Sequence, residues 1–254
     1  MDPRDYIQSL PPHRLLRAKL LSSHLILKDG AVIYDMGCYD GALTAALAAL
    51  NPYLTFIGVD RNVGNVQVAN DRFKFDNLSF IHDDITELEN IPDNSADAVI
   101  NERILGVVYT RSGYNSDKVQ DAIENQFRIL KKNGTYLLYD YIMKPEDEYV
   151  LMEFPVMKGT GFKTRSNMKG EDKNYQGERD CDALVWYSKN AHPSKGKGDD
   201  FKGFFLEETP AKRPFTRLFR LPHRWAYEFT LRMDNTDVHI DAARGEFSCL
   251  TVED

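Results

Sequence analysis

The chain has 254 residues, of which 42% are hydrophobic and 28% are charged, and its formal net charge at pH 7 is -7. This apolar content excludes a disordered chain and predicts one globular domain with an elaboration. No stretch stays apolar over the roughly 20 residues that a membrane-spanning helix requires, since even 31–50 contains Asp35 and Asp40. Acidic residues at Asp2 and Asp5 are unlike a secretory signal, so we expect a cytoplasmic protein without a membrane span.

The charge and cysteine patterns exclude further classes. Residues 1–150 contain 15 Lys and Arg against 22 Asp and Glu, whereas 151–254 contain 17 of each, so a general affinity for nucleic acid is not favoured. The three cysteines are widely spaced without a CxxC pattern, which predicts neither a disulfide framework nor a metal site. For the one dense basic cluster, a solvated face is favoured over a nucleic-acid surface. This cluster comprises Lys212, Arg213, Arg217, Arg220 and Arg224.

Apolar periodicity predicts helices and strands that alternate along the first part of the chain. The elements expected in order are a helix over 10–27, a strand over 31–36, a helix over 42–50, a strand over 54–59, a helix over 63–73, strands over 78–82 and 96–100, a helix over 116–130 and a strand over 135–141. This alternation predicts an α/β fold of three layers, with a mostly parallel sheet between helices and ligands bound beyond the carboxyl ends of the strands.

The alternation ends near residue 142, so we expect a core domain over 1–142 and a lid or substrate-binding region over 143–254. The elements expected in the second region are a helix over 179–190, a flexible polar tract over 194–200, strands over 201–206 and 215–221 and a helix over 222–233. Residues 251–254 are typical of a helix start, which predicts that the last strands of the fold are missing. A strand over 246–252 is the alternative.

The most informative motif is the loop Asp35-Met36-Gly37-Cys38-Tyr39-Asp40-Gly41, followed after the next expected strand by Asp60 and Arg61. Gly37 and Gly41 allow the backbone to pass close to a ligand and to turn into the helix. Asp60, about 20 residues further on, is placed to accept hydrogen bonds from a ribose diol. The arrangement resembles the first motifs of the class I S-adenosylmethionine-dependent methyltransferases, and the resemblance implies a Rossmann-like fold with that cofactor.

A dinucleotide-binding dehydrogenase is the competing interpretation, because it also combines a glycine loop with a distal acid. Its pyrophosphate requires G-x-G-x-x-G at a helix start free of acids, whereas this loop has G-x-x-x-G between Asp35 and Asp40. Two carboxylates repel phosphate and suit a cationic ligand such as S-adenosylmethionine. A plain strand-to-helix turn without a ligand is the third, least favoured interpretation.

Later segments resemble the same family in order and spacing. Phe80-Ile81-His82-Asp83-Asp84-Ile85 is similar to the segment in which an acid, here Asp84 rather than Asp83, binds the adenine amino group. Residues 96–103 and 130–138 are similar to the fourth strand with its exit and to the turn into the fifth. The resemblance covers 15–140 and implies the strand order 3-2-1-4-5. The cofactor residues that it implies are Asp35, Gly37, Cys38, Gly41, Asp60, Arg61, Asp84, Ile85 and Asn101.

The acceptor side of the site is less defined. Methyltransferases of adenine or glutamine nitrogens carry Asn/Asp-Pro-Pro-Tyr at the fourth strand's exit, and this chain has Asn101-Glu102-Arg103-Ile104 instead. Residues 105–114 look like the substrate-facing loop of small-molecule methyltransferases, with Tyr109 and Tyr114 as contacts or as packing aromatics. His223 is a further candidate base, although methyl transfer from a sulfonium often needs none.

These observations favour an enzyme that methylates a small molecule by S_N2 attack on the cofactor's methyl group. One alternative is an RNA or protein methyltransferase that docks its polymer on the basic segment 212–224. The other is a methyltransferase-like module that binds a ligand or partner without catalysis.

Overall fold

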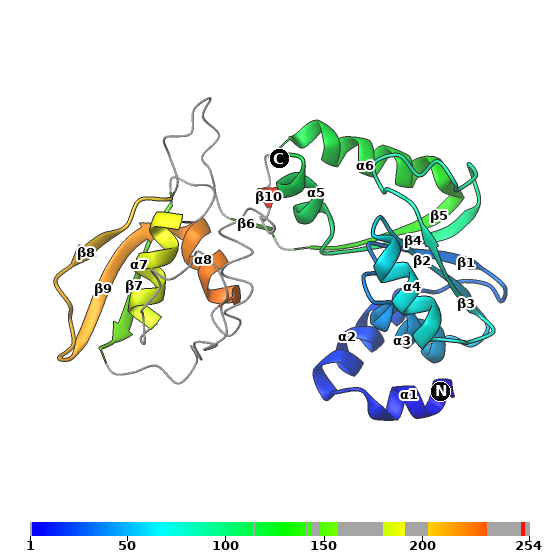
Figure 1. The fold of residues 1–254 in the computed structure, drawn as a ribbon, viewed down its shortest axis with the longest axis horizontal. Helices are drawn as coiled ribbons and strands as arrows, with labels where there is room; N and C mark the ends of the chain where they lie inside the picture. Colours follow the sequence, from blue (N-terminus) through cyan, green and yellow to red (C-terminus); the bar gives the residue numbers. More distant parts are fainter. Residues whose placement is uncertain are drawn as a thin grey trace. The chain divides into compact units, whose positions relative to one another are not determined.

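The computed structural model describes residues 2–113, 115–140, 142–143, 148–156, 180–190, 203–232 and 250–251. The chain divides into two compact units, Met1–Val108 with Asn115–Asp140, and Tyr109–Tyr114 with Tyr141–Asp254. Each unit is described by itself (Figure 1). None of the helices in the described ranges is long and apolar enough to span a membrane.

The first unit is built on a parallel sheet of five strands in the order β3-β2-β1-β4-β5. The strands are β1 (Val32–Met36), β2 (Thr55–Asp60), β3 (Leu78–His82), β4 (Ala96–Glu102) and β5 (Leu130–Tyr139). The α/β fold and the strand order predicted from the sequence are therefore confirmed. Because the strands are parallel, the carboxyl ends of β1, β2 and β4 lie at the same edge, where a ligand is expected.

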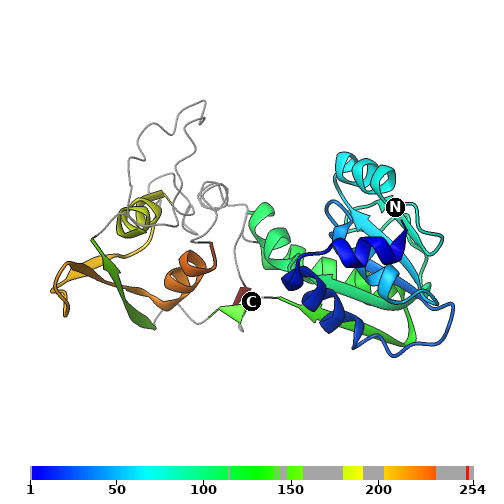
Figure 2. The ribbon, with the colours of Figure 1, turned by 90° about the horizontal axis from the view of Figure 1, so that it is seen from below.

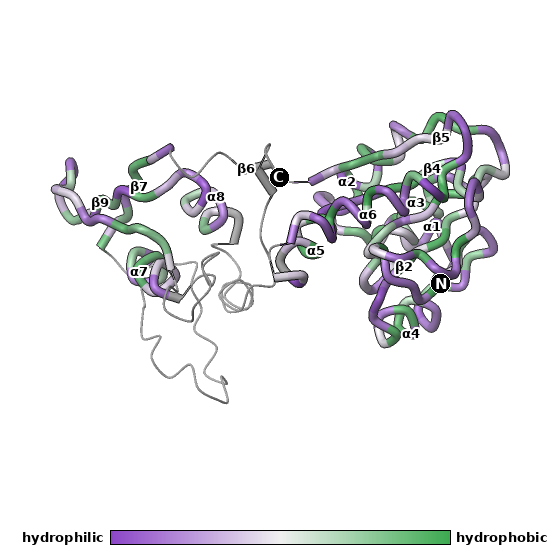
Figure 3. Tube along the Cα trace, turned by 90° about the horizontal axis from the view of Figure 1, so that it is seen from above, coloured by the Kyte–Doolittle hydropathy of each residue, from purple (hydrophilic) through white to green (hydrophobic). Residues whose placement is uncertain are grey.

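Helices cover both faces of this sheet, with α1 to α3 on one side and α6 on the other (Figures 1 and 2). The helices of this unit are α1 (Pro3–Ser9), α2 (Pro12–Ser22), α3 (Ala42–Leu50), α4 (Val63–Arg72) and α6 (Ser116–Ile129). Helix α5 (Leu105–Arg111) begins in this unit and ends in the second. The strands carry hydrophobic segments, whereas α6 carries long hydrophilic ones, as a helix with one solvent-facing side should (Figure 3).

Two predictions about helices need correction. The helix expected over 10–27 is α2, which is shorter, because it begins after the extended Pro11 and ends at Ser22. The sequence did not predict α1, which precedes it with the Asp2 side chain as its cap. The segment 105–114, expected to be a substrate-facing loop, contains α5 over Leu105–Arg111. β-branched residues lower helix propensity, which hid this helix in the sequence.

The core of the first unit lies around α3. Its residues Ala45, Ala46 and Ala48 are nearly inaccessible to solvent, and their small side chains let α1 and α2 pack closely over it. Tyr6 of α1 packs edge-on against Phe73, with ring centroids 5.0 Å apart, and its hydroxyl donates to the Ala42 carbonyl over 2.8 Å. This contact fixes α1 above the first turn of α3, beside the loop that follows β1.

The second unit has an antiparallel sheet in the order β7-β9-β8 and two helices that share its core. Its elements are β7 (Tyr149–Pro155), α7 (Asp180–Asn190), β8 (Glu207–Thr209), β9 (Thr216–Pro222) and α8 (His223–Arg232). Phe154, Tyr187, Phe219 and Phe229 are buried where helices and sheet meet.

The structure confirms α7, β9 and α8 near their expected positions, but the sequence did not predict β7. The strand expected over 201–206 is wrong in its described part, because 203–206 are irregular and β8 starts only at Glu207. A short parallel pair joins β6 (Ile142–Met143) to β10 (Leu250–Thr251). Thr251 therefore belongs to a strand and does not start a helix. At Leu250 and Thr251 this agrees with the alternative prediction of a strand over 246–252. The rest of 246–254 lies outside the described residues.

Candidate functional site

A cavity of about 330 Å³ lies in the first unit at the edge where β1 and β4 end. Helix α2 contributes Arg14 and Arg17, and the loop after β1 contributes residues 37–40. Glu102 and Arg103 complete the lining at the exit of β4. The cavity therefore lies at the strand ends where the sequence predicted a ligand, with basic side chains that the prediction did not include.

Backbone hydrogen bonds fix the loop after β1. The amides of Gly37 and Cys38 donate to the Val59 carbonyl over 2.8 and 2.9 Å, and that of Gly41 donates to the Cys38 carbonyl over 2.9 Å. Gly41 caps α3 with a φ of 73°, a left-handed conformation that glycine adopts without steric cost. Both predicted loop glycines also make room for side chains, because a Cβ would lie 2.5 Å from Ile104 at Gly37 and 2.5 Å from Phe80 at Gly41.

Asp35 is the buried acid of the cavity, with only 2% of its surface exposed. Thr44 donates to its carboxylate over 2.6 Å. Burial raises the pKa of Asp35 to about 6, although the Thr44 hydrogen bond and the charge of Arg17 act in the opposite direction. A carboxylate in such surroundings gains stability from a cationic ligand group, which would favour its ionised form.

Basic side chains reach the cavity from α2 and from the residue that follows β4. Glu102, whose side chain is 10% exposed, forms an ion pair with Arg17 and accepts a hydrogen bond from Arg103 Nε over 2.8 Å. Two guanidinium groups thus share one carboxylate. Arg14 lies on the exposed side of α2 and also lines the cavity. The site presents acidic and basic groups to one small volume, which suits a ligand that carries both signs of charge.

Asp60, at the end of β2, holds the loop after β1 and is not among the residues that line the cavity. Its Oδ2 accepts from the Tyr39 amide over 2.9 Å, and its Oδ1 accepts from the Asn62 amide over 2.8 Å and from Asn65 Nδ2 over 3.2 Å. An ionised carboxylate has about four acceptor positions, so these three bonds leave room for one more donor. Only 8% of Asp60 is exposed.

The loop after β3 distinguishes the two neighbouring acids. Asp83 is buried and accepts the amides of Asp84 and Asn90 over 2.9 Å each, so it supports the loop. Asp84 remains about one-third exposed, accepts from the Thr86 amide and hydroxyl, and lies 3.8 Å from Arg61 Nη1. Ile85 is buried. This geometry leaves Asp84 as the accessible acid of the pair.

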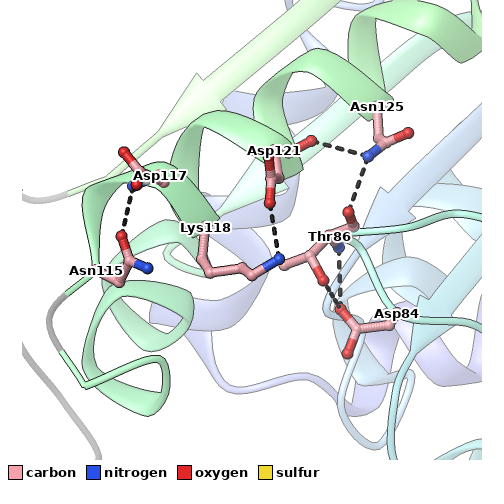
Figure 4. Close-up of polar contacts among 7 residues, drawn as sticks. All are labelled: Asp84, Thr86, Asn115, Asp117, Lys118, Asp121 and Asn125. Carbon is pink, nitrogen blue, oxygen red and sulfur yellow. Dashed lines mark hydrogen bonds and ion pairs between the residues drawn. The ribbon is translucent and has the colours of Figure 1, made fainter.

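Helix α6 anchors the same loop. Asn125 donates from the helix to the Thr86 carbonyl over 2.8 Å and to the Asp121 carbonyl over 3.0 Å (Figure 4). Asp84 is therefore connected through Thr86 to a regular element, in addition to its ion pair with Arg61. The carboxylate that the resemblance assigns to adenine is held in place by secondary structure.

Cys38 is buried between acids. Burial raises the pKa of its thiol far above the usual range, and the charges of Asp35 and Asp60 add to that effect. The thiol is therefore neutral at physiological pH, and a neutral buried thiol is neither a nucleophile nor a base.

Asn101 does not line the cavity. It is fully buried, and its side chain donates to Gln126 of α6 over 3.0 Å. Successive residues of a strand face opposite sides of a sheet, so Glu102 lines the cavity while Asn101 packs under α6. A direct contact of the Asn101 side chain with a ligand in this cavity is not supported.

The three candidate catalytic residues all belong to the second unit. Tyr109 is fully buried within α5, and Tyr114 lies outside the described residues. His223 begins α8 in the second unit, where its Nδ1 lies 3.4 Å from Glu148 Oε2. Among the described residues, no group of three or more His, Cys, Asp or Glu side chains could hold a metal ion.

A family model described as "Methyltransferase domain" matches residues 27–195. A comparison with curated proteins found no match.

Solved structures match over about half of this chain and about half of their own length. The YcgJ protein of Bacillus subtilis is 26% identical, with a TM-score of 0.43 over 53% of each chain. A chain in the complex of the Haloferax volcanii Trm112 methyltransferase activator is 28% identical, with a TM-score of 0.38 over 47% of this chain and 48% of that one. A geranyl diphosphate methyltransferase in complex with GPP and sinefungin is 17% identical, with a TM-score of 0.41 over 56% of this chain and 46% of that one.

The family match begins before β1 and covers more than half of the chain, including the glycine loop, the acid that ends β2 and the strand ends that form the cavity. It decides between the two cofactor classes that the glycine loop left open, against a dinucleotide-binding dehydrogenase. The chain belongs to the class I S-adenosylmethionine-dependent methyltransferases.

Proposed function

We propose that this protein transfers the methyl group of S-adenosylmethionine to a small-molecule acceptor. The cofactor supplies a methyl group on a positively charged sulfur, which an acceptor O, N or C atom attacks from the opposite side. The observation that carries the proposal is the cavity at the ends of β1 and β4, where Asp35 and the Arg17–Glu102–Arg103 cluster face the same volume.

The donor set fits the amino-acid end of the cofactor. Asp35, whose ionised form burial disfavours, would accept the ammonium group. Arg17 and Arg103 would receive the carboxylate, since guanidinium groups bind carboxylates through charge-assisted hydrogen bonds. The remaining acceptor position of Asp60 would take a ribose hydroxyl, and Asp84 the adenine amino group. The chain thereby orients the reactive methyl, and orientation alone supplies a large part of the rate enhancement in such reactions.

The ion pairs of the basic segment in the second unit favour a small-molecule acceptor over RNA. Arg217 lies 2.8 Å from Glu208 and 3.3 Å from Asp182, and Arg220 lies 3.3 Å from Glu207. These arginines of the basic segment are already compensated by acids. A surface that binds phosphates needs cations whose charge is not neutralised locally.

The acceptor class is tested with S-adenosylmethionine labelled in its methyl group, incubated with the protein and either a small-molecule extract, total RNA or a protein mixture. Label in the small-molecule fraction is the expected result. Label only in RNA or protein would overturn the small-molecule assignment. Cofactor binding without label in any fraction would favour the non-catalytic module.

The role of Asp35 predicts a pH dependence of cofactor affinity. Because the carboxyl has a pKa of about 6 in the free protein and must ionise to bind an ammonium group, affinity should rise with pH. Between pH 5 and pH 7 the ionised fraction grows about tenfold, so the dissociation constant should fall by about tenfold. Isothermal titration calorimetry at a series of pH values measures this.

Asp35→Asn is the matched variant for that experiment, since it keeps the size of the side chain and removes its titration. It should bind the cofactor weakly and with an affinity that changes little between pH 5 and pH 7. An equally steep pH profile in this variant would assign the titration to another group.

A further inference from the structure

Tyr39 stands in the glycine loop in a backbone conformation that costs free energy. Its φ is 51°, in the left-handed region that bulky residues rarely adopt. The conformation is imposed by the loop, because the Tyr39 amide donates to Asp60 and the Gly41 amide donates to the Cys38 carbonyl. Glycine at this position would satisfy the same hydrogen bonds without strain.

Packing does not explain why a tyrosine is present. The residue is 67% exposed. Among the described residues, its side chain takes part in no hydrogen bond, ion pair or ring contact. It does, however, line the cavity. Backbone strain that gains no folding contact is typical of residues kept for ligand binding.

The charges of the cavity define what the ring would contact. Asp40 is paired with Arg72 over 3.0 Å, and Glu102 is paired with Arg17 and Arg103. Asp35 is the acid suited to the ammonium group of the cofactor. Of the acids that line the described cavity, none is then left to offset the second positive charge, on the sulfonium sulfur.

We propose that the Tyr39 ring forms a cation–π contact with the sulfonium group of the cofactor, and that the protein tolerates a strained loop for this contact. The inference rests on the proposed function. Aromatic faces bind cations of this soft, poorly hydrated kind, as they bind quaternary ammonium ligands. The contact would discriminate the charged cofactor from its neutral demethylated product, and so would favour exchange of product for fresh cofactor.

The test compares binding of S-adenosylmethionine with binding of S-adenosylhomocysteine, which lacks the sulfur charge, in the full chain. Tyr39→Gly should raise the melting temperature by about 2 °C, because it relieves the strain. It should weaken S-adenosylmethionine binding about fivefold and S-adenosylhomocysteine binding less than twofold. Tyr39→Phe should keep the wild-type ratio of the two affinities, and Tyr39→Leu should lose it.

Phe215→Gly is the matched control, since Phe215 is also an exposed aromatic residue with a positive φ, of 58°, and does not line the cavity. It should raise the melting temperature without changing either affinity. The inference is overturned if Tyr39→Gly keeps the wild-type ratio of the two affinities, whether both affinities stay unchanged or both fall by the same factor. Failure of the proposed function is seen separately, because wild-type protein would then bind neither compound or would bind S-adenosylmethionine without labelling the small-molecule fraction.

Discussion

Replacement of Gly41 by alanine is expected to lower the free energy of unfolding by about 3 kcal/mol, through left-handed strain and overpacking together. Gly41 has a φ of 73°, and a Cβ there would lie 2.5 Å from the Phe80 ring and 2.8 Å from Ala69. Phe80 is buried and packs near Phe73, so its ring has little space to move away. Equilibrium unfolding in urea, followed by circular dichroism, measures the loss.

Gly30→Ala separates the two causes of that loss. Gly30 has a φ of 78°, but no atom lies within 4 Å of the position that a Cβ would occupy. Only the conformational penalty applies, so this variant should lose about 1 kcal/mol. Equal losses in the two variants would show that the contact with Phe80 does not constrain the loop.

The elements that the sequence predicted well are those that local signals delimit. Helix α3 matches its predicted range, 42–50, because an alanine- and leucine-rich run lies between Gly41 and the Asn51-Pro52 pair. Strand β3 likewise matches over 78–82. Strand β7 was not predicted, since it lies in a stretch rich in charged residues and ends in Pro155. Its pairing with β9, more than sixty residues away, has no local signature.

The same distinction between local and long-range sequence signals applies to the candidate site. The glycine loop and the position of Asp60 at a strand end could be predicted from sequence, because their spacing follows from one strand-loop-helix-strand unit. The Arg17–Glu102–Arg103 cluster could not, because Arg17 reaches the cavity from a helix and the other two residues from the end of a distant strand. The sequence did hold one usable signal. Successive residues of a strand face opposite sides of a sheet, so Asn101 and Glu102 could not both line the cavity, and Glu102 was the better candidate.

Replacement of Asp60 by alanine should remove measurable cofactor binding and also destabilise the fold. The substitution deletes the acceptor for three donors, the amides of Tyr39 and Asn62 and the side chain of Asn65. Loss of charge-assisted hydrogen bonds at a buried site costs about 3 kcal/mol in total. The loop after β1 would then lose its connection to β2, so the ribose would lose its partner and the cavity its shape. Calorimetric titration and urea unfolding give the two quantities.

Asp97→Ala distinguishes a specific effect of Asp60 from general destabilisation. Asp97 accepts from the Val32 amide over 2.9 Å and from Lys131 Nζ over 2.7 Å, near the amino ends of β1 and β4, at the edge opposite the cavity. Its loss should cost about 1–2 kcal/mol and leave cofactor affinity unchanged. If Asp60→Ala bound S-adenosylmethionine as tightly as Asp97→Ala does, the Asp60 carboxylate would be a loop support only. Because Asp60 has one acceptor position left after its three internal bonds, we expect Asp60→Ala to bind S-adenosylmethionine much more weakly than Asp97→Ala does. Asp60→Asn should lie between the wild type and Asp60→Ala in both stability and affinity.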